Sequence, residues 1–433
     1  MTEQRWLRII PVALIMYTIS YVDRTNVALA LDPRLSTMMT DLGMTDRVKG
    51  NAVGIFFWGY LLLQIPGGWL ASHWSARKIV SIFLVCWGAA AVGCGLVHTV
   101  GQFKVMRFLL GIAESGVFPA TLVLLANWFP RTERARANAY WNLCQPLAVA
   151  GAAPITGALL GHWGWRTALI LEGALPFIWL PIWWFFIRDH PREAKWISHE
   201  EREHLETTLA RETAHLSSGV QVPLWRTIIQ PAVFVMVPVY FLQNCAAYGC
   251  NTFLSEALKS PGLNFTPFHT GILYAIPYLV AAVVMVLNSR HSDKMQERRG
   301  HVAFVYALSG ACLIISVLLR KHNFWVSYGF LCMAIPGPFA GLAPFWAIPA
   351  ETLPRHSLGI VMGLVNAMGN VGGWAGNYVF GWLKEETKDV TVPFGVLGAG
   401  LLLAALLCFL LPKSKPHVMQ KLEEPVGTGG ASA

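Results

Sequence analysis

The chain has 433 residues, of which 55% are hydrophobic and 13% are charged, whereas ordinary globular proteins contain about 25% charged residues. This composition excludes a soluble protein of two or three domains and indicates a membrane protein, because each helix that crosses a bilayer needs about 20 apolar residues. The net charge of +9 is spread over several short loops, which excludes nucleic acid as a partner. All eight cysteines lie in apolar segments, where we expect packing residues and neither disulfides nor metal ligands.

Twelve apolar runs follow one another along the chain, each bounded by charges or by glycine and proline. They predict an all-α membrane protein with twelve transmembrane helices in two halves of six. The first run lacks a small-residue cleavage site, so we expect a retained helix. The predicted spans are 9–31, 51–71, 78–98, 102–128, 137–161, 167–188, 231–256, 268–289, 301–319, 323–349, 358–382 and 392–412.

One long polar segment separates the two halves. In it, Ser198 lies three residues before Glu201 and good helix formers follow, which predicts a capped, solvated helix. His199 and His204 are five residues apart, whereas a zinc-binding helical pair needs a spacing of four, so we expect no metal site. The predicted domains are an N-terminal six-helix bundle (1–188), a cytoplasmic linker with an amphipathic helix (189–230), a C-terminal six-helix bundle (231–412) and a cytoplasmic tail (413–433).

The lysines and arginines orient the chain. With a cytoplasmic N-terminus, the tails and even-numbered loops contain 21 of them and the odd-numbered loops contain 10. Cytoplasmic loops carry the excess of positive charge, so both termini are expected in the cytoplasm. The segments "GGWLASHWSARK" and "NSRHSDKMQERR" close the second and eighth spans and align Ser72 with Asp293, 221 residues later. Such related halves usually flank a site near the bilayer midplane.

The first span contains Asp23 and Arg24 in an otherwise apolar run. Its ten Ile, Val and Leu residues each favour insertion by about 0.5 kcal/mol, whereas each of the two charges costs about 2.5 to 3.5 kcal/mol. Because these contributions nearly cancel, the charged face should turn to the protein interior. A transport pathway is the preferred explanation, and a purely structural ion pair is the alternative.

The fourth span contains two further charges, Arg107 and Glu114. They are seven residues apart and therefore share one helix face, about 10 Å from each other along the axis. Breaking and re-forming a pair such as Asp23 with Arg107 would couple proton binding to helix movement. Arg24 is the candidate for holding a substrate carboxylate, because its planar fork matches that group and it stays charged.

Further polar residues within the spans are candidates for lining a cavity, although amide side chains are as often hydrogen-bonded between helices. Three glutamates, Glu172, Glu256 and Glu351, lie near predicted span ends, where reaching the membrane interface would explain them. The cavity candidates are Tyr21, Asn26, Tyr60, Gln145, Asn244, Tyr248, Asn366 and Asn370.

Several segments resemble the anion:cation symporter family of the major facilitator superfamily, and the likeness spans almost the whole chain. Within that family, the bacterial tartrate, phthalate and hydroxyphenylacetate permeases are the most similar. The segments that carry the resemblance include "YVDRTNVALA" from Tyr21, "QIPGGWLASHWSARK" from Gln64, "RFLLGIAESGVFPATLVLLANWFPRTERARA" from Arg107 and "GLVNAMGNVGGWAGNYVFGWL" from Gly363.

The resemblance implies a monomer in the bacterial inner membrane that imports a small organic carboxylate with protons by alternating access. The proton gradient would supply the energy, and no cofactor is expected. The family's first-span motif falls on Tyr21, Asp23 and Arg24, which implies that the arginine binds substrate and the aspartate takes part in proton coupling. The remaining implied positions are Arg107 and Glu114 for proton coupling, and Tyr60, Gln145 and either Asn366 or Asn370 for substrate contact.

The chain departs from the family pattern in two places. The loop motif after span two keeps Gly68, Arg77 and Lys78 but has serine at position 72, so the carboxylate expected to latch the two halves on the inside is missing. In span seven, Ser255 replaces a usual proline and Glu256 follows it, which bears on the outer gate. The second copy of the loop motif keeps Asp293, Lys294 and Arg298.

Two alternatives come from other classes. An exporter of drugs or organic cations would use Asp23 or Glu114 to bind a positive substrate, but the adjacent Arg24 argues against it. A membrane-embedded enzyme would need a catalytic set, and the spans contain no Ser/His/Asp set, metal-ligand cluster or phosphate-binding loop. The transported anion itself stays open among hydroxy-dicarboxylates such as tartrate, sugar acids and aromatic acids.

Overall fold

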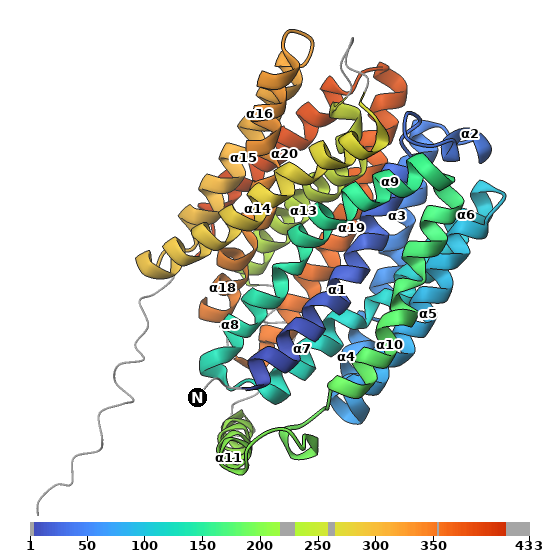
Figure 1. The fold of residues 1–433 in the computed structure, drawn as a ribbon. Coiled ribbons are helices and arrows are strands. Elements are labelled where there is room, and N and C mark those ends of the chain that lie inside the picture. Colours follow the sequence, from blue (N-terminus) through green and yellow to red (C-terminus); the bar gives the residue numbers. More distant parts are fainter. Residues whose placement is uncertain (1–3, 217–229, 259–264, 353–354, 413–433) are drawn as a thin grey trace, which may run out of the picture.

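The computed structural model describes residues 4–216, 230–258, 265–352 and 355–412, and every regular element in these ranges is helical. Figure 1 shows two groups of helices side by side, the N-terminal half in blue to green and the C-terminal half in yellow to red. The N-terminal half contains α1 (Gln4–Ala30), α2 (Met38–Asp41), α3 (Asp46–Leu62), α4 (Gln64–Leu70), a π-helical turn (Ala71–Ser75), α5 (Ala76–Leu96), α6 (Val100–Ser115), α7 (Val117–Trp128), α8 (Arg131–Asn142), α9 (Cys144–Gly173) and α10 (Leu175–Phe186).

The linker and the C-terminal half follow the same helical pattern. We call the end of the bundle where α1 begins and α11 lies the near end, and the opposite end, which carries α2, the far end (Figure 1). The elements are a 3₁₀ turn (Pro191–Glu193), α11 (His199–Leu216), α13 (Pro231–Ala257), α14 (Pro267–Met295), α15 (Arg299–Leu319), α16 (Phe324–Ala334), α17 (Pro336–Ala340), α18 (Leu342–Thr352), α19 (Arg355–Thr387) and α20 (Thr391–Cys408).

Nine stretches of the described residues are long and apolar enough to cross a membrane. One of them, Tyr140–Phe186, covers most of the fifth and sixth predicted spans, and Gly164, with a φ of +74°, interrupts the helix between them. Two further predicted spans coincide with α3 followed by α4 and with α19; α3 and α19 are not among the nine stretches, whereas most of α4 belongs to the stretch Pro66–Leu96. The all-helical membrane fold is confirmed, and the number of twelve spans stays a prediction.

The linker is attached to the near end of the N-terminal half. The Trp196 ring stacks on Trp128 with ring centroids 5.2 Å apart, and Arg5 lies 2.9 Å from Glu133 and 3.8 Å from Glu201. The Ser198 hydroxyl accepts the Glu201 amide at 3.2 Å, which confirms the predicted cap of α11. These contacts pack the first part of the linker against the N-terminal bundle.

The two halves approach each other backbone to backbone at the far end. A Cβ on Gly50 of α3 would lie 2.2 Å from the Asn377 carbonyl oxygen of α19. A Cβ on Gly157 of α9 would lie 2.5 Å from the Pro267 carbonyl oxygen of α14. Real side-chain carbons do not fit at these distances, so the glycines permit the contact, and the far end is closed.

Candidate functional site

A buried ion pair joins α1 to α6 in the interior of the N-terminal half. The Nη2 and Nε atoms of Arg24 donate to one oxygen of Glu114 at 2.9 and 3.1 Å. The Ser20 hydroxyl donates to the same oxygen at 2.7 Å, since Ser20 and Arg24 are four residues apart and share a helix face. Glu114 has no exposed surface and Arg24 is 9% exposed, so the pair is almost fully removed from solvent.

Aromatic rings surround the Arg24 guanidinium. Its Cζ atom lies 4.8 Å from the ring centre of Tyr21, 4.9 Å from Tyr60 and 5.1 Å from Phe56, distances at which a cation is attracted to a ring face. Its Nη1 atom lies 3.5 Å from the Tyr248 hydroxyl of α13. Because Tyr248 belongs to the C-terminal half, the site lies between the two halves, and both contribute to it.

Asp23 has a separate environment, because consecutive residues of a helix point about 100° apart. The Trp87 indole of α5 donates to its carboxylate at 2.5 Å, and Asn26 donates to the other oxygen at 3.5 Å. Arg107 donates to the backbone carbonyl of Asp23 at 3.3 Å and has only 1% exposure. The structure thus brings Asp23 and Arg107 together, whereas the ion pair of this region among the described residues joins Arg24 to Glu114.

The predicted amide side chains form a second cluster, mainly in the C-terminal half. Asn244 donates to the Tyr240 carbonyl and to the Gln243 side chain, both at 2.8 Å. Asn370 donates to the Asn366 carbonyl at 2.9 Å. Asn244 lies one helical turn before Tyr248, the residue of α13 that contacts Arg24.

Two of the predicted amides have partners elsewhere. Asn366 donates to Gln64 of α4 across the two halves at 3.2 Å. Gln145 donates to Asn142 at 3.0 Å within the N-terminal half. Neither amide has a hydrogen bond to Arg24 among the described residues, so their predicted contact with substrate stays a prediction.

Several residues of the site were not predicted from the sequence. Ser20 and Trp87 each bind a predicted carboxylate; the position of Ser20 one turn before Arg24 was an available signal, but nothing marked Trp87. Glu172, which was expected to reach the membrane interface, is only 4% exposed and accepts a hydrogen bond from Thr156 at 2.6 Å. The N-terminal half therefore buries a third carboxylate within its helices.

The loop motif after α4 has a carboxylate from another part of the chain. Asp189, which follows α10, accepts the Ser75 hydroxyl at 2.5 Å and the Arg77 amide at 2.9 Å. The Ser75 hydroxyl also accepts a hydrogen bond from the Lys78 amide at 3.0 Å. Gly68 packs closely on α7, because a Cβ at this position would lie 3.1 Å from the Pro119 side chain. The motif residues thus stabilise the N-terminal half internally.

Ser72 itself makes no bond to the other half among the described residues. Its hydroxyl donates to the Trp69 carbonyl of the same turn at 2.9 Å. In the second copy of the motif, Asp293 is ion-paired with Arg298, which also donates to Ser292 at 3.1 Å. The contacts described for both motifs lie within their own halves, and the predicted difference in latching the two halves stays a prediction.

We expect Ser72→Asp to shift the population toward the conformation closed at the near end and open at the far end. A carboxylate at a helix terminus contributes about 0.3–1 kcal/mol, which corresponds to about a two- to fivefold change in population. The rate of thiol labelling of reporter cysteines at the near end should fall accordingly. Ser72→Asn introduces a side chain of the same size as aspartate but without its charge, and it should leave the labelling rate unchanged. Equal labelling of Ser72→Asp and the parent would refute the latch.

Comparison with known proteins decides the family. A model of the Major Facilitator Superfamily matches residues 13–377. The chain belongs to this superfamily. The transporter is 30% identical over 423 residues to a protein of Agrobacterium vitis named "Putative tartrate transporter", covering 95% of this chain and 91% of the relative. It is 29% identical to the "Quinolone resistance transporter" of Acinetobacter baumannii, covering 93% of each chain.

A solved structure supports the fold independently. A bacterial homologue of the human lysosomal transporter Spinster, in an inward-facing and occupied conformation, superposes with a TM-score of 0.74 at 16% identity, covering 95% of this chain and 97% of that chain. At this identity the likeness shows the fold alone. The protein is a multi-pass membrane transporter and not an enzyme, and the bacterial relatives agree with the predicted inner membrane.

Proposed function

We propose that the transporter imports a small organic carboxylate together with protons by alternating access, and that it acts as a monomer. The buried pair of Arg24 and Glu114 in the N-terminal half, beside Tyr248 of the C-terminal half, is the observation that carries this proposal. A guanidinium held among aromatic rings is a specific partner for a carboxylate, because two parallel hydrogen bonds fix the orientation of the anion.

The geometry of the pair links the anion to the proton. Arg24 donates to Glu114 through two of its nitrogen atoms, so a bound substrate carboxylate and an ionised Glu114 compete for the same guanidinium. A proton on Glu114 removes its negative charge and leaves Arg24 available to the substrate. Each co-transported proton also cancels one negative charge of the anion, and moving each uncancelled charge against the membrane potential costs about 2.3 kcal/mol per 100 mV.

The substrate class follows from the groups around the site. The amides Asn244, Asn366 and Asn370 offer donors and acceptors for hydroxyl groups, and the rings around Arg24 offer apolar surface for a carbon chain or an aromatic ring. The relative named for tartrate supports a hydroxy-dicarboxylate, and sugar acids and aromatic acids belong to the same proposed class.

Export of a drug is the second candidate, and the relative named for quinolone resistance favours it. Net direction separates the two candidates. Proteoliposomes containing the purified transporter should accumulate a radiolabelled carboxylate, from a panel that includes tartrate, glucarate and benzoate, only when the outside is acidic. Proton-driven movement of an organic cation or drug, with no movement of any carboxylate, would overturn the proposal in favour of the second candidate.

A further inference from the structure

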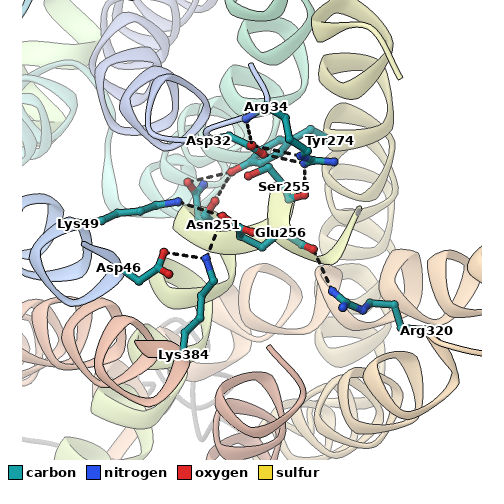
Figure 2. A network of polar contacts seen from close by, with 10 residues as sticks. All are labelled: Asp32, Arg34, Asp46, Lys49, Asn251, Ser255, Glu256, Tyr274, Arg320 and Lys384. Carbon is teal, nitrogen blue, oxygen red and sulfur yellow. Dashed lines mark hydrogen bonds and ion pairs between the residues drawn. The ribbon is translucent and has the colours of Figure 1, made fainter. Parts of the chain in front are cut away.

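Charged side chains from both halves converge at the far end of the bundle, where α3 lies beside α13 and α19 (Figure 2). Asp46 and Lys49 come from the first turn of α3, in the N-terminal half. Glu256 and Lys384 come from the last turns of α13 and α19, in the C-terminal half. We call these four residues the far-end charge cluster. They lie well beyond the Arg24 site, toward the predicted outer side of the membrane.

The cluster has alternating charges, and two of its ion pairs cross between the halves. One oxygen of Glu256 lies 3.1 Å from the Lys384 Nζ and 3.7 Å from the Lys49 Nζ. The Lys384 Nζ lies 2.7 Å from an Asp46 oxygen. Each half thus contributes one cation and one anion, and each cation contacts the anion of the opposite half.

Two members of the cluster are removed from water completely. Lys49 has no exposed surface, Glu256 is 1% exposed, and the Lys49 Nζ lies over the Phe253 ring at 4.6 Å from its centre. Isolated buried ions are costly, so Lys49 depends on the Glu256 carboxylate for its charge to be tolerated. This burial exists only while α3 and α19 are in contact.

The neighbouring backbone explains why water is excluded. A Cβ on Gly381 would lie 2.4 Å from the Asp46 carbonyl oxygen, and a Cβ on Gly50 would lie 2.2 Å from that of Asn377. These glycines let α3 and α19 touch along their backbones on both sides of Lys49. Closing the far end and burying the cluster are therefore one event.

A third contact crosses the halves beside the cluster. Arg34 donates to Asp32 at 2.7 Å and to the Ser255 carbonyl at 2.5 Å, as Figure 2 shows. Burial acts to raise the pKa of the Asp32 carboxyl, but the hydrogen bonds and the charge of Arg34 hold that pKa below its usual value. Asp32 therefore stays ionised and keeps Arg34 in place.

We propose that the far-end charge cluster is the outer gate of the transporter, a two-state element that holds the far end closed and re-pairs within each half when the far end opens. The inference rests on the proposed alternating access. When the halves separate, Glu256 keeps Lys384, and Asp46 and Lys49 remain three residues apart on one face of α3, where such side chains can interact. Each half then keeps one cation and one anion of the cluster, so opening leaves no charged side chain of the cluster without a partner of opposite charge.

The gate requires a specific pattern among charge variants. Glu256→Gln removes the carboxylate 3.7 Å from the buried Lys49 ammonium, so the ratio of far-end-open to closed molecules should rise at least tenfold. Adding Lys49→Met removes the buried ammonium that has lost the Glu256 carboxylate, so the double variant should return toward the closed state. A purely structural ion pair would instead lower thermal stability in the single variant without changing the separation of the halves.

The experiment measures one distance across the far end by pulsed electron paramagnetic resonance. Spin labels are placed on cysteines at the exposed residues Thr40 and Lys321, in the full-length protein with the exposed Cys86 replaced by serine. Glu256→Gln should add a longer distance that the double variant loses. A folded Glu256→Gln protein with the parent distribution, or a double variant as open as the single, would overturn the gate.

A steric variant tests the same gate without changing charge. Gly50→Ala places a methyl group against the Asn377 carbonyl and should add the same longer distance, whereas Gly395→Ala, which has open space around its Cβ position, should not. Identical distributions in both alanine variants would contradict the coupling between close backbone contact and closure. These distances need neither substrate nor protons, so failure of the gate is distinguishable from failure of the proposed uptake.

Discussion

Arg24→Ala is expected to weaken binding of a carboxylate substrate by about 30-fold or more. Truncating one partner of a buried, hydrogen-bonded charge pair typically costs about 2–5 kcal/mol, and about 1.4 kcal/mol corresponds to each factor of ten in Kd. Arg24→Lys should recover only part of the affinity, because an ammonium keeps the charge but loses the planar fork. Isothermal titration calorimetry with the best substrate from the uptake panel measures these values directly.

The control for this variant lies on the same helix. Arg8→Ala removes an exposed guanidinium that lies over the Trp196 ring at 5.1 Å, far from the Arg24 site, and it should leave affinity unchanged. Thermal unfolding distinguishes loss of binding from loss of fold, since Arg24→Ala leaves Glu114 buried with Ser20 as a hydrogen-bond donor. A folded Arg24→Ala protein with the parent Kd would refute the assigned role of this arginine.

The helical architecture could be predicted from the sequence because lipid demands long apolar runs, and the four charges of the first and fourth spans stood out against that background. The side chains that contact these four charges could not be predicted. Asp23 and Arg24 are neighbours in sequence, yet one faces Trp87 and the other faces Glu114. Which neighbour each side chain meets depends on how α1 and α6 are rotated about their axes, and sequence spacing within one helix carries no information on that rotation.

The glutamates near span ends illustrate a different limit. Proximity to a span end predicts contact with the membrane interface only when that end of the helix is exposed. Glu256 is 1% exposed because the two halves meet at the far end of α13. Its partners Lys49 and Lys384 are distant in sequence and lie just outside the predicted spans 51–71 and 358–382, where charges are ordinary. These residues form a buried cluster only when the far end is closed, and the composition of the chain does not indicate which end is closed.

Glu114→Gln should abolish proton-driven accumulation while preserving exchange of substrate across the membrane. Glutamine has nearly the shape of a protonated glutamate, and it holds no negative charge against Arg24, so the guanidinium stays available for the anion at every pH. Substrate affinity of the parent should weaken as pH rises, because ionised Glu114 then pairs with Arg24, and the variant should lose this dependence. One coupled proton and a gradient of one pH unit correspond to about 1.4 kcal/mol, or about tenfold accumulation, which the variant should lack.

Proteoliposomes with an imposed pH gradient and counterflow assays measure accumulation and exchange separately on the same preparation. Glu203→Gln, on the exposed surface of α11, is the matched control and should accumulate substrate as the parent does. Exchange without accumulation is the outcome that only a coupling residue gives, because a structural defect would reduce both. If Glu114→Gln accumulates the anion as strongly as the parent, the proton is carried elsewhere, and Asp23 and Glu172, two further carboxylates buried within helices of the N-terminal bundle, become the positions to substitute next.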